Sequence, residues 1–138
     1  MDAKLFFYEL GKVIYHIDAV YDDFAKQSGV APTLLWILYA LNDGRSHTQK
    51  EICQDWELPK STVNTIITEL KQHGYLVLRP IKGKRREMTI LLTKDGQNYA
   101  NVLLDGIYKK EAEVFQSLST EDQNVLIYLK KTVDLLKR

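Results

Sequence analysis

Apolar residues recur along most of the chain at intervals of three and four, the spacing that places side chains on one face of an α-helix. The longest such run starts near Lys4 and ends near Gln27, and a mixed aromatic and charged stripe lies beside it. The apolar stripe consists of Phe6, Leu10, Val13, Ile17, Val20 and Phe24. Because this helix is apolar on more than one side, it requires more than one partner surface.

A short central helix is predicted next. Gly29 ends the first helix, and Pro32 suits the first turn of the second, where a missing backbone N–H costs nothing. The residues from Leu34 to Leu41 are apolar on nearly every side. We therefore expect this helix at the centre of the fold.

Two more short helices follow. Thr48 with Glu51 three residues later is typical of a capping box, which predicts a helix over residues 49–56. After a short linker, a second helix is expected over residues 59–73, and Gly74 ends it in the left-handed conformation. Two short helices joined by such a turn predict a helix-turn-helix.

Strand-like segments cover residues 75–80 and 88–92, and the loop between them contains a glycine, so we expect a β-hairpin. Thr93 can cap a helix over residues 94–116. Ser119 with Asp122 resembles another cap and predicts a last helix that ends near residue 137. The expected order is α-α-α-α-β-β-α-α.

The composition is that of a globular protein. The chain has 138 residues, of which 45% are hydrophobic and 27% charged, so a single domain with its own core is expected and disorder is not. Its one cysteine, Cys53, cannot form an intramolecular disulfide. No apolar run reaches the length of a membrane span, and no secretory signal precedes the first helix. A cytoplasmic protein without a membrane partner is expected.

The net charge of +1 hides a local cluster of positive charge. The segment from Leu70 to Arg86 carries six basic residues and no acidic one, so the rest of the chain carries a net charge of −5. A positive cluster on an otherwise acidic chain indicates a site for a polyanion, and a solvated basic loop is the plainer alternative.

The helix after Pro59 has two distinct faces. On a helical wheel its apolar residues form the core face, and the opposite face is polar and uncharged. The core face holds Val63, Ile66, Ile67 and Leu70, and the polar face holds Ser61, Asn64, Thr65, Thr68 and Gln72. Small uncharged side chains of this kind suit hydrogen bonds to base edges, although they also occur on ordinary surfaces.

At this point the sequence resembles the MarR family of bacterial winged helix-turn-helix regulators. The resemblance is carried by the order and spacing of four short stretches, at residues 48–52, 60–63, 70–76 and 92–96. It implies a mainly α fold with a small β-hairpin: a winged helix-turn-helix domain at 31–96 and dimerisation helices at 1–30 and 97–138. It also implies a homodimer on the double-stranded DNA of a pseudo-palindromic operator.

The residues and the resemblance together assign two sets of contacts. The predicted DNA contacts are Thr48, Lys60, Ser61, Thr62, Asn64, Thr65, Thr68, Lys82, Lys84, Arg85 and Arg86. Arg86 matches the family's wing arginine, whereas Lys84 stands where family members often carry an acid. The family also binds small phenolic or aromatic effectors, and residues that could line such a site, or simply form dimer core, are Tyr8, Tyr15, His16, Trp36 and Tyr39.

The expected function is a DNA-binding transcriptional repressor. The alternatives are a winged-helix adaptor for protein partners, a thiol-based redox sensor that uses Cys53, and a regulator of the PadR type. Residues His16, His47 and His73 lack metal-ligand spacing, and no motif of an enzyme is present. No catalytic activity, metal or cofactor is therefore expected.

Overall fold

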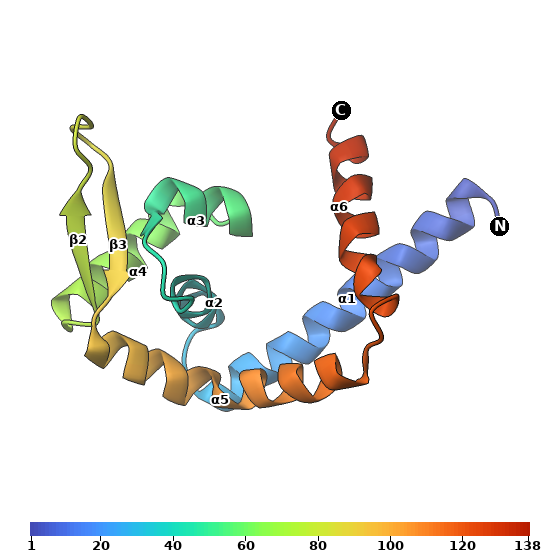
Figure 1. Cartoon of the computed structure of the whole chain (residues 1–138), viewed down its shortest axis with the longest axis horizontal. Coiled ribbons are helices and arrows are strands. Elements are labelled where there is room, and N and C mark those ends of the chain that lie inside the picture. The colour runs from blue at the N-terminus through green and yellow to red at the C-terminus, as the bar shows by residue number, and fades with distance from the viewer. The chain divides into compact units, whose positions relative to one another are not determined.

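The computed structural model describes residues 1–138 and contains two compact units, Met1–Asp105 and Gly106–Arg138. The first unit contains α1 (Ala3–Ser28), α2 (Pro32–Leu41), β1 (His47–Thr48), α3 (Gln49–Trp56), α4 (Lys60–Gln72), β2 (Leu76–Pro80), β3 (Met88–Leu92) and the first half of α5 (Lys94–Ser117) (Figure 1). The second unit holds the rest of α5, a 3₁₀ turn at Asp122–Asn124 and α6 (Val125–Leu136). The mainly helical fold class is confirmed, whereas the functional division at 31–96 stays a prediction.

The expected two-stranded hairpin is part of a three-stranded sheet, so the predicted element order was incomplete. The two residues of β1 pair antiparallel with β3, with His47 opposite Ile90 and Thr48 opposite Thr89. The sheet order is β1-β3-β2. A two-residue strand is too short to show the alternation of a β-strand, which explains why the sequence pattern missed it.

The start of the last helix also differs from the prediction. The reciprocal cap forms as expected: the Ser119 N–H donates to Asp122 Oδ2 (2.9 Å), and the Asp122 N–H donates to Ser119 Oγ (3.0 Å). Hydrogen bonds to the carboxylate from the backbone N–H and the side chain of Ser119 lower the pKa of Asp122. However, the first turn after the cap is a 3₁₀ helix, and α6 begins only at Val125.

The core of the first unit surrounds α2, which contacts α1, α4 and β3. Leu35, Ile37 and Leu38 of α2 are fully buried. The helical wheel of α4 is confirmed, since its four predicted core residues are the ones that are buried. Burial of these apolar side chains fixes the orientation of α4, so its polar face points to solvent.

A tight joint connects the end of α4, the start of β2 and the start of α5. The Thr93 hydroxyl donates to the carbonyl of Gly74 (2.7 Å) and accepts from the N–H of Gly96 (3.1 Å). The Thr93 N–H donates to the carbonyl of Tyr75 (3.0 Å), and the Tyr75 ring stacks on Tyr99 at 4.4 Å. Two of the four stretches that carry the family resemblance, 70–76 and 92–96, meet in this joint.

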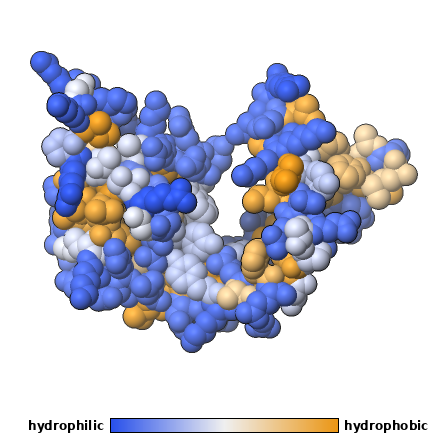
Figure 2. Space-filling model, viewed as in Figure 1, coloured by the Kyte–Doolittle hydropathy of each residue, from blue (hydrophilic) through white to orange (hydrophobic).

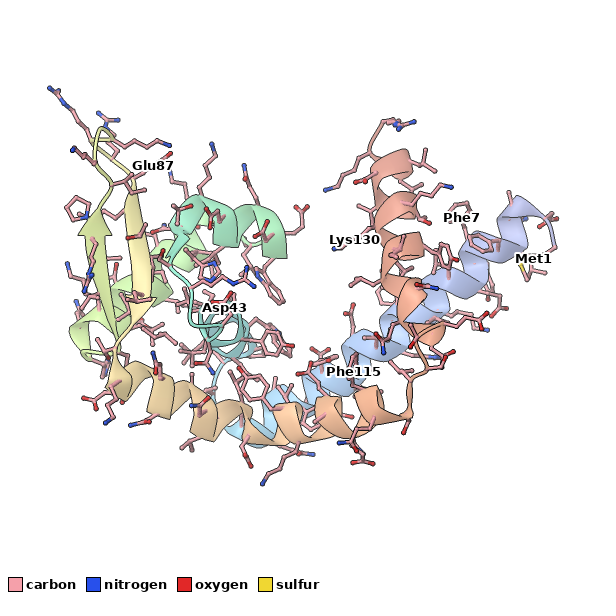
Figure 3. The ribbon with its side chains drawn as sticks, viewed as in Figure 1. Met1, Phe7, Asp43, Glu87, Phe115 and Lys130 are labelled. Atoms are coloured by element: carbon pink, nitrogen blue, oxygen red, sulfur yellow. The ribbon has the colours of Figure 1, made fainter.

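Long apolar faces remain exposed on α1 and, separately, on α6. On α1, Val13, Ile17 and Val20 are about half exposed, and Figure 2 shows hydrophobic residues over the N-terminal end of this helix. Figure 3 shows Phe7 projecting from the same end. On α6, Leu126 and Leu136 are exposed by 57% and 68%. None of the helices combines the length and the apolar character that crossing a bilayer requires.

Candidate nucleic-acid interface

The outward face of α4 presents small polar groups whose hydrogen bonds differ from residue to residue. The Thr65 hydroxyl donates to the carbonyl of Ser61 (3.0 Å), and the Thr68 hydroxyl donates to the carbonyl of Asn64 (2.8 Å). Both protons are thus used within the helix, which leaves the methyl groups and oxygen lone pairs for an outside partner. The side-chain amide of Asn64 forms no hydrogen bond and keeps both its donors and its acceptor.

Thr48 is held in place by the predicted capping box at the start of α3. The Glu51 N–H donates to the Thr48 hydroxyl oxygen (3.1 Å), and the Thr48 N–H donates to Glu51 Oε2 (3.4 Å). The hydroxyl oxygen accepts in this cap, so its own proton stays available for another acceptor. Thr48 can therefore cap the helix and donate to a phosphate oxygen at the same time.

A cavity of about 640 Å³ lies between α3, α4 and the hairpin. It brings together four of the predicted DNA contacts from three separate parts of the chain: Thr48, Lys60, Asn64 and Arg86. Its walls also include the apolar side chains of Leu78, Met88 and Ile90. Cations and a free amide thus face one concave surface, which is the arrangement that a charged and hydrogen-bonding ligand requires.

The hairpin carries the basic cluster at its tip. It stands beside α3, and its end is hydrophilic (Figures 1 and 2). Gly83 adopts a φ of +83°, a left-handed conformation that favours glycine, and so allows the loop to turn. Lys84 Nζ contacts Glu87 Oε2 at 3.1 Å, and Figure 3 labels this glutamate near the hairpin tip. Arg86 has no ion-pair partner, so Glu87 orients Lys84 and not the arginine.

The predicted DNA contacts are accessible but do not form one cluster. Nine are exposed: Lys60, Ser61, Asn64, Thr65, Thr68, Lys82, Lys84, Arg85 and Arg86; Thr48 and Thr62 are half-buried. Only the four named above line the large cavity, and Lys84 joins Thr48 at a neighbouring cavity of about 490 Å³. The others lie on the open surface of α4 or on the hairpin.

Sequence reasoning missed three polar residues of α3. Gln49, Lys50 and Gln54 line the large cavity, and Lys50 and Gln54 also line the neighbouring one. Their four-residue spacing places Lys50 and Gln54 on one face of the helix. That spacing was visible in the sequence, but it identifies a shared face and not what the face meets.

An acidic network flanks this surface. His47 Nε2 lies 2.8 Å from Asp43 Oδ1, and His47 Nδ1 lies 3.8 Å from Glu51 Oε2. Partial desolvation raises the pKa of Asp43. Hydrogen bonds from the His47 ring and from the Arg45 N–H lower this pKa by more than desolvation raises it, so the net shift is downward. Figure 3 labels Asp43 in the segment after α2. The network ties that segment to β1 and α3, and no group of three metal-ligating side chains is placed to hold an ion.

The residues predicted to line an effector site separate into two groups. Trp36 and Tyr39 line a cavity of about 410 Å³ between α1, α2 and α3. Tyr8 and Tyr15 are exposed by 66% and 74% on α1, and neither they nor His16 line this cavity. The sequence pattern could not separate the groups, because all five residues lie on apolar or aromatic helix faces.

Cys53 lies on α3, is partly buried and lines the large cavity with Asn64 and Arg86. Cys53 is thus neither fully buried nor on the open surface. Its thiol is within the concave surface that the proposed DNA contacts share.

Comparison with known proteins agrees with this architecture. Residues 28–87 match the model of the MarR family. NMB1585, a MarR family regulator from Neisseria meningitidis, superposes with a TM-score of 0.79 at 28% identity, over 94% of this chain and 92% of that one. The fold is shared by MepR of S. aureus in its DNA-binding conformation (TM-score 0.75, 19% identity, 94% and 98% covered).

NadR in complex with 4-hydroxyphenylacetate has the same fold (TM-score 0.73, 13% identity, 91% and 89% covered). Among the curated proteins, none matches the sequence. The family model covers the helix-turn-helix, and the fold of a MarR family regulator extends over nearly the whole chain. The chain is therefore similar to the MarR family model over residues 28–87, and it shares the fold of a MarR family regulator over nearly its whole length.

Proposed function

We propose that the chain is a transcriptional repressor that binds a specific sequence of double-stranded DNA as a homodimer. The observation that carries this proposal is the concave surface on which Asn64 of α4, Thr48 at the end of β1 and Arg86 of the hairpin converge. It joins a free amide, which can read a base edge, to cations that can hold the phosphate backbone. Repression follows because a dimer that occupies an operator excludes other proteins from that DNA.

The two kinds of contact have separate roles. The polar face of α4 would lie in the major groove, with Ser61, Asn64, Thr65 and Thr68 at the bases. The backbone contacts would come from Thr48, Lys60, Thr62, Lys82, Lys84, Arg85 and Arg86. The hairpin cations would lie along the backbone or the minor groove, as the wing of a winged helix does. Base contacts would set specificity, and phosphate contacts would set most of the affinity.

The homodimer is supported by the exposed apolar faces of α1 and α6. A contiguous apolar stripe on the surface of a soluble chain usually marks an interface. On α6 the stripe consists of Leu126, Leu129, Val133 and Leu136, and the opposite side carries Lys131 and Asp134 beside Ile127 and Leu135. Covering it with a second copy would remove apolar surface from water at about 25 cal/mol per Å².

Leu126→Asp is expected to convert the dimer to a monomer, because it places a carboxylate in the apolar stripe of α6. Ile127→Asp is the matched control: it makes the same change at the next residue, which is exposed by 62% and lies about 100° around the helix from Leu126, on the side of Lys131. Light scattering after size exclusion measures the mass of each variant. A monomeric wild type, or equal effects of the two changes, would contradict this interface.

An effector would act by linkage. A small aromatic molecule that binds better to the conformation free of DNA lowers operator affinity by its differential binding free energy. We place this effector at the cavity lined by Trp36 and Tyr39. Tyr8, Tyr15 and His16 would instead belong to the surface that the dimer covers.

A second candidate is a thiol-based redox sensor, which the position of Cys53 in the large cavity favours. Oxidation of Cys53 would add a polar group beside Asn64 and Arg86 and so weaken DNA binding. Cys53→Ser distinguishes a redox sensor from a regulator that does not sense oxidants. If Cys53 is the sensor, peroxide weakens DNA binding by the wild type and not by the variant. If it is not, peroxide has the same effect on DNA binding by the wild type and by the variant.

Selection from random duplexes tests the main proposal. A dimer with two copies of α4 should enrich an inverted repeat with half-sites about one helical turn apart. Recovery of no preferred sequence would overturn sequence-specific recognition and favour an adaptor for protein partners.

A further inference from the structure

We propose that the cavity between α1, α2 and α3 binds an aromatic cation, and that its effector is therefore cationic and not an aromatic acid. The inference rests on the proposed effector site, and it adds the charge of the ligand. Its basis is the set of side chains that line this cavity of about 410 Å³: Ile17, Asp18, Tyr21, Asp22, Trp36, Tyr39 and Trp56.

The aromatic side chains form a continuous wall. The Tyr21 and Trp36 rings lie 5.6 Å apart at 67°, and the Trp36 and Tyr39 rings lie 6.3 Å apart at 76°. The Tyr39 and Trp56 rings lie 5.7 Å apart at 77°. In each pair the planes are tilted steeply, so neighbouring rings present both edges and π-faces. A cation within about 6 Å of a ring face is attracted by the negative charge of that face.

The charge of the lining points the same way. Asp18 and Asp22 lie four residues apart on α1, on one face of the helix, and both line the cavity. Neither carboxylate has a hydrogen bond or an ion pair with another side chain. The lining contains no lysine, arginine or histidine. The cavity therefore carries two uncompensated negative charges beside four aromatic rings.

These features select among aromatic ligands. A cationic ring system would stack on the tryptophans and place its charge near the two carboxylates. An aromatic carboxylate of similar size would bring a third negative charge to the same rim without a cation to neutralise it. The volume lies within the range of small-molecule sites, about 300–1,000 Å³. A single aromatic cation is thus the occupant that fits the size, the walls and the charge.

The two tryptophans make this site directly observable. Trp36 and Trp56 are the only tryptophans of the chain, and both line the cavity. Their emission is to be followed while the protein is titrated with benzyltrimethylammonium, with phenylacetate as the anionic probe and benzyl alcohol as the neutral one. We expect a saturable change with the cation, at an affinity at least tenfold above that of the other two probes. The cation's affinity should also fall with added salt.

The variant Asp18→Asn/Asp22→Asn keeps the size of both side chains and removes both charges. It should bind the cation about tenfold more weakly and should lose the preference over phenylacetate. Asp23→Asn is the matched control, because this aspartate is exposed on the same helix but does not line the cavity. Calorimetric titration of each variant confirms that the emission change reports binding.

Equal binding of phenylacetate and the cation, or an unchanged affinity in the double variant, would overturn the inference. So would the absence of any saturable response to the cation. These outcomes are independent of the proposed function, because operator binding is measured on the same protein without any probe. If the protein binds DNA but not the cation, only the cationic effector is contradicted. If it binds the cation but no DNA, only the DNA-binding regulator is contradicted.

Discussion

Gly96→Ala is expected to destabilise the protein by about 3 kcal/mol, because the added methyl group has no space. A Cβ at this position would overlap the carbonyl oxygen of Tyr75 and would lie 2.7 Å from its carbonyl carbon. These are backbone atoms, so no side-chain rotation can relieve the contact. The same carbonyl accepts the hydrogen bond from the Thr93 N–H, which the displacement would also break.

Thermal unfolding at one fixed protein concentration measures this effect, since the stability of a dimer depends on concentration. A loss of about 3 kcal/mol corresponds to a fall in melting temperature of roughly 10 °C for a chain of this size. Gln97→Ala, at the next and exposed position of α5, should change stability by less than about 0.5 kcal/mol. A melting temperature of Gly96→Ala within 2 °C of the wild type would correspond to a loss of less than about 1 kcal/mol. It would contradict the close approach of position 96 to the Tyr75 carbonyl.

Asn64→Ala and Arg85→Ala are expected to impair DNA binding in different ways. The amide of Asn64 is free on the outer face of α4, so its removal should cost about 1–3 kcal/mol on the preferred duplex and relax the preference at one base pair. Arg85 has no ion-pair partner in the structure, unlike Lys84, which contacts Glu87. Its removal should weaken binding to every sequence alike and lower the salt slope by about 0.9 for each phosphate that the arginine neutralises.

Both variants are to be compared on the selected duplex and on a scrambled one at several salt concentrations. Gln72→Ala is the control, because Gln72 lies on the polar side of α4 but is not among the proposed DNA contacts. If Asn64→Ala lowered the affinity for both duplexes equally, or Arg85→Ala changed base preference, the division between base reading and backbone binding would be wrong.

Much of the fold could be predicted because it follows from local signals. The period of the apolar residues in α4, the capping box of Thr48 and Glu51, and the left-handed Gly74 all occur as expected. By contrast, β1 exists only through its pairing with β3, and two residues carry no pattern of their own. The joint around Gly96 likewise depends on a contact with Tyr75, which lies far away in the sequence.

The candidate site was predictable in its residue types but not in its grouping. The polar face of α4 and the basic hairpin could be recognised separately, since each is a continuous segment. Their meeting at one cavity, together with Lys50 and Gln54 of α3, depends on how the sheet orients the hairpin. The aromatic residues show the limit most clearly: Trp36 and Tyr39 share a cavity with Asp18 and Asp22, whereas Tyr8 and Tyr15 are left on the surface.

The most direct test of DNA recognition is a fluorescence anisotropy titration of the selected duplex and a scrambled duplex, from about 50 to 200 mM salt. We expect tighter binding to the selected duplex at every salt concentration, and a steep fall in affinity for both as salt rises. The difference in affinity between the two duplexes measures base recognition by α4. The dependence of affinity on salt concentration measures the phosphate contacts. Weak binding that is equal for both duplexes and independent of salt would contradict a DNA-binding regulator.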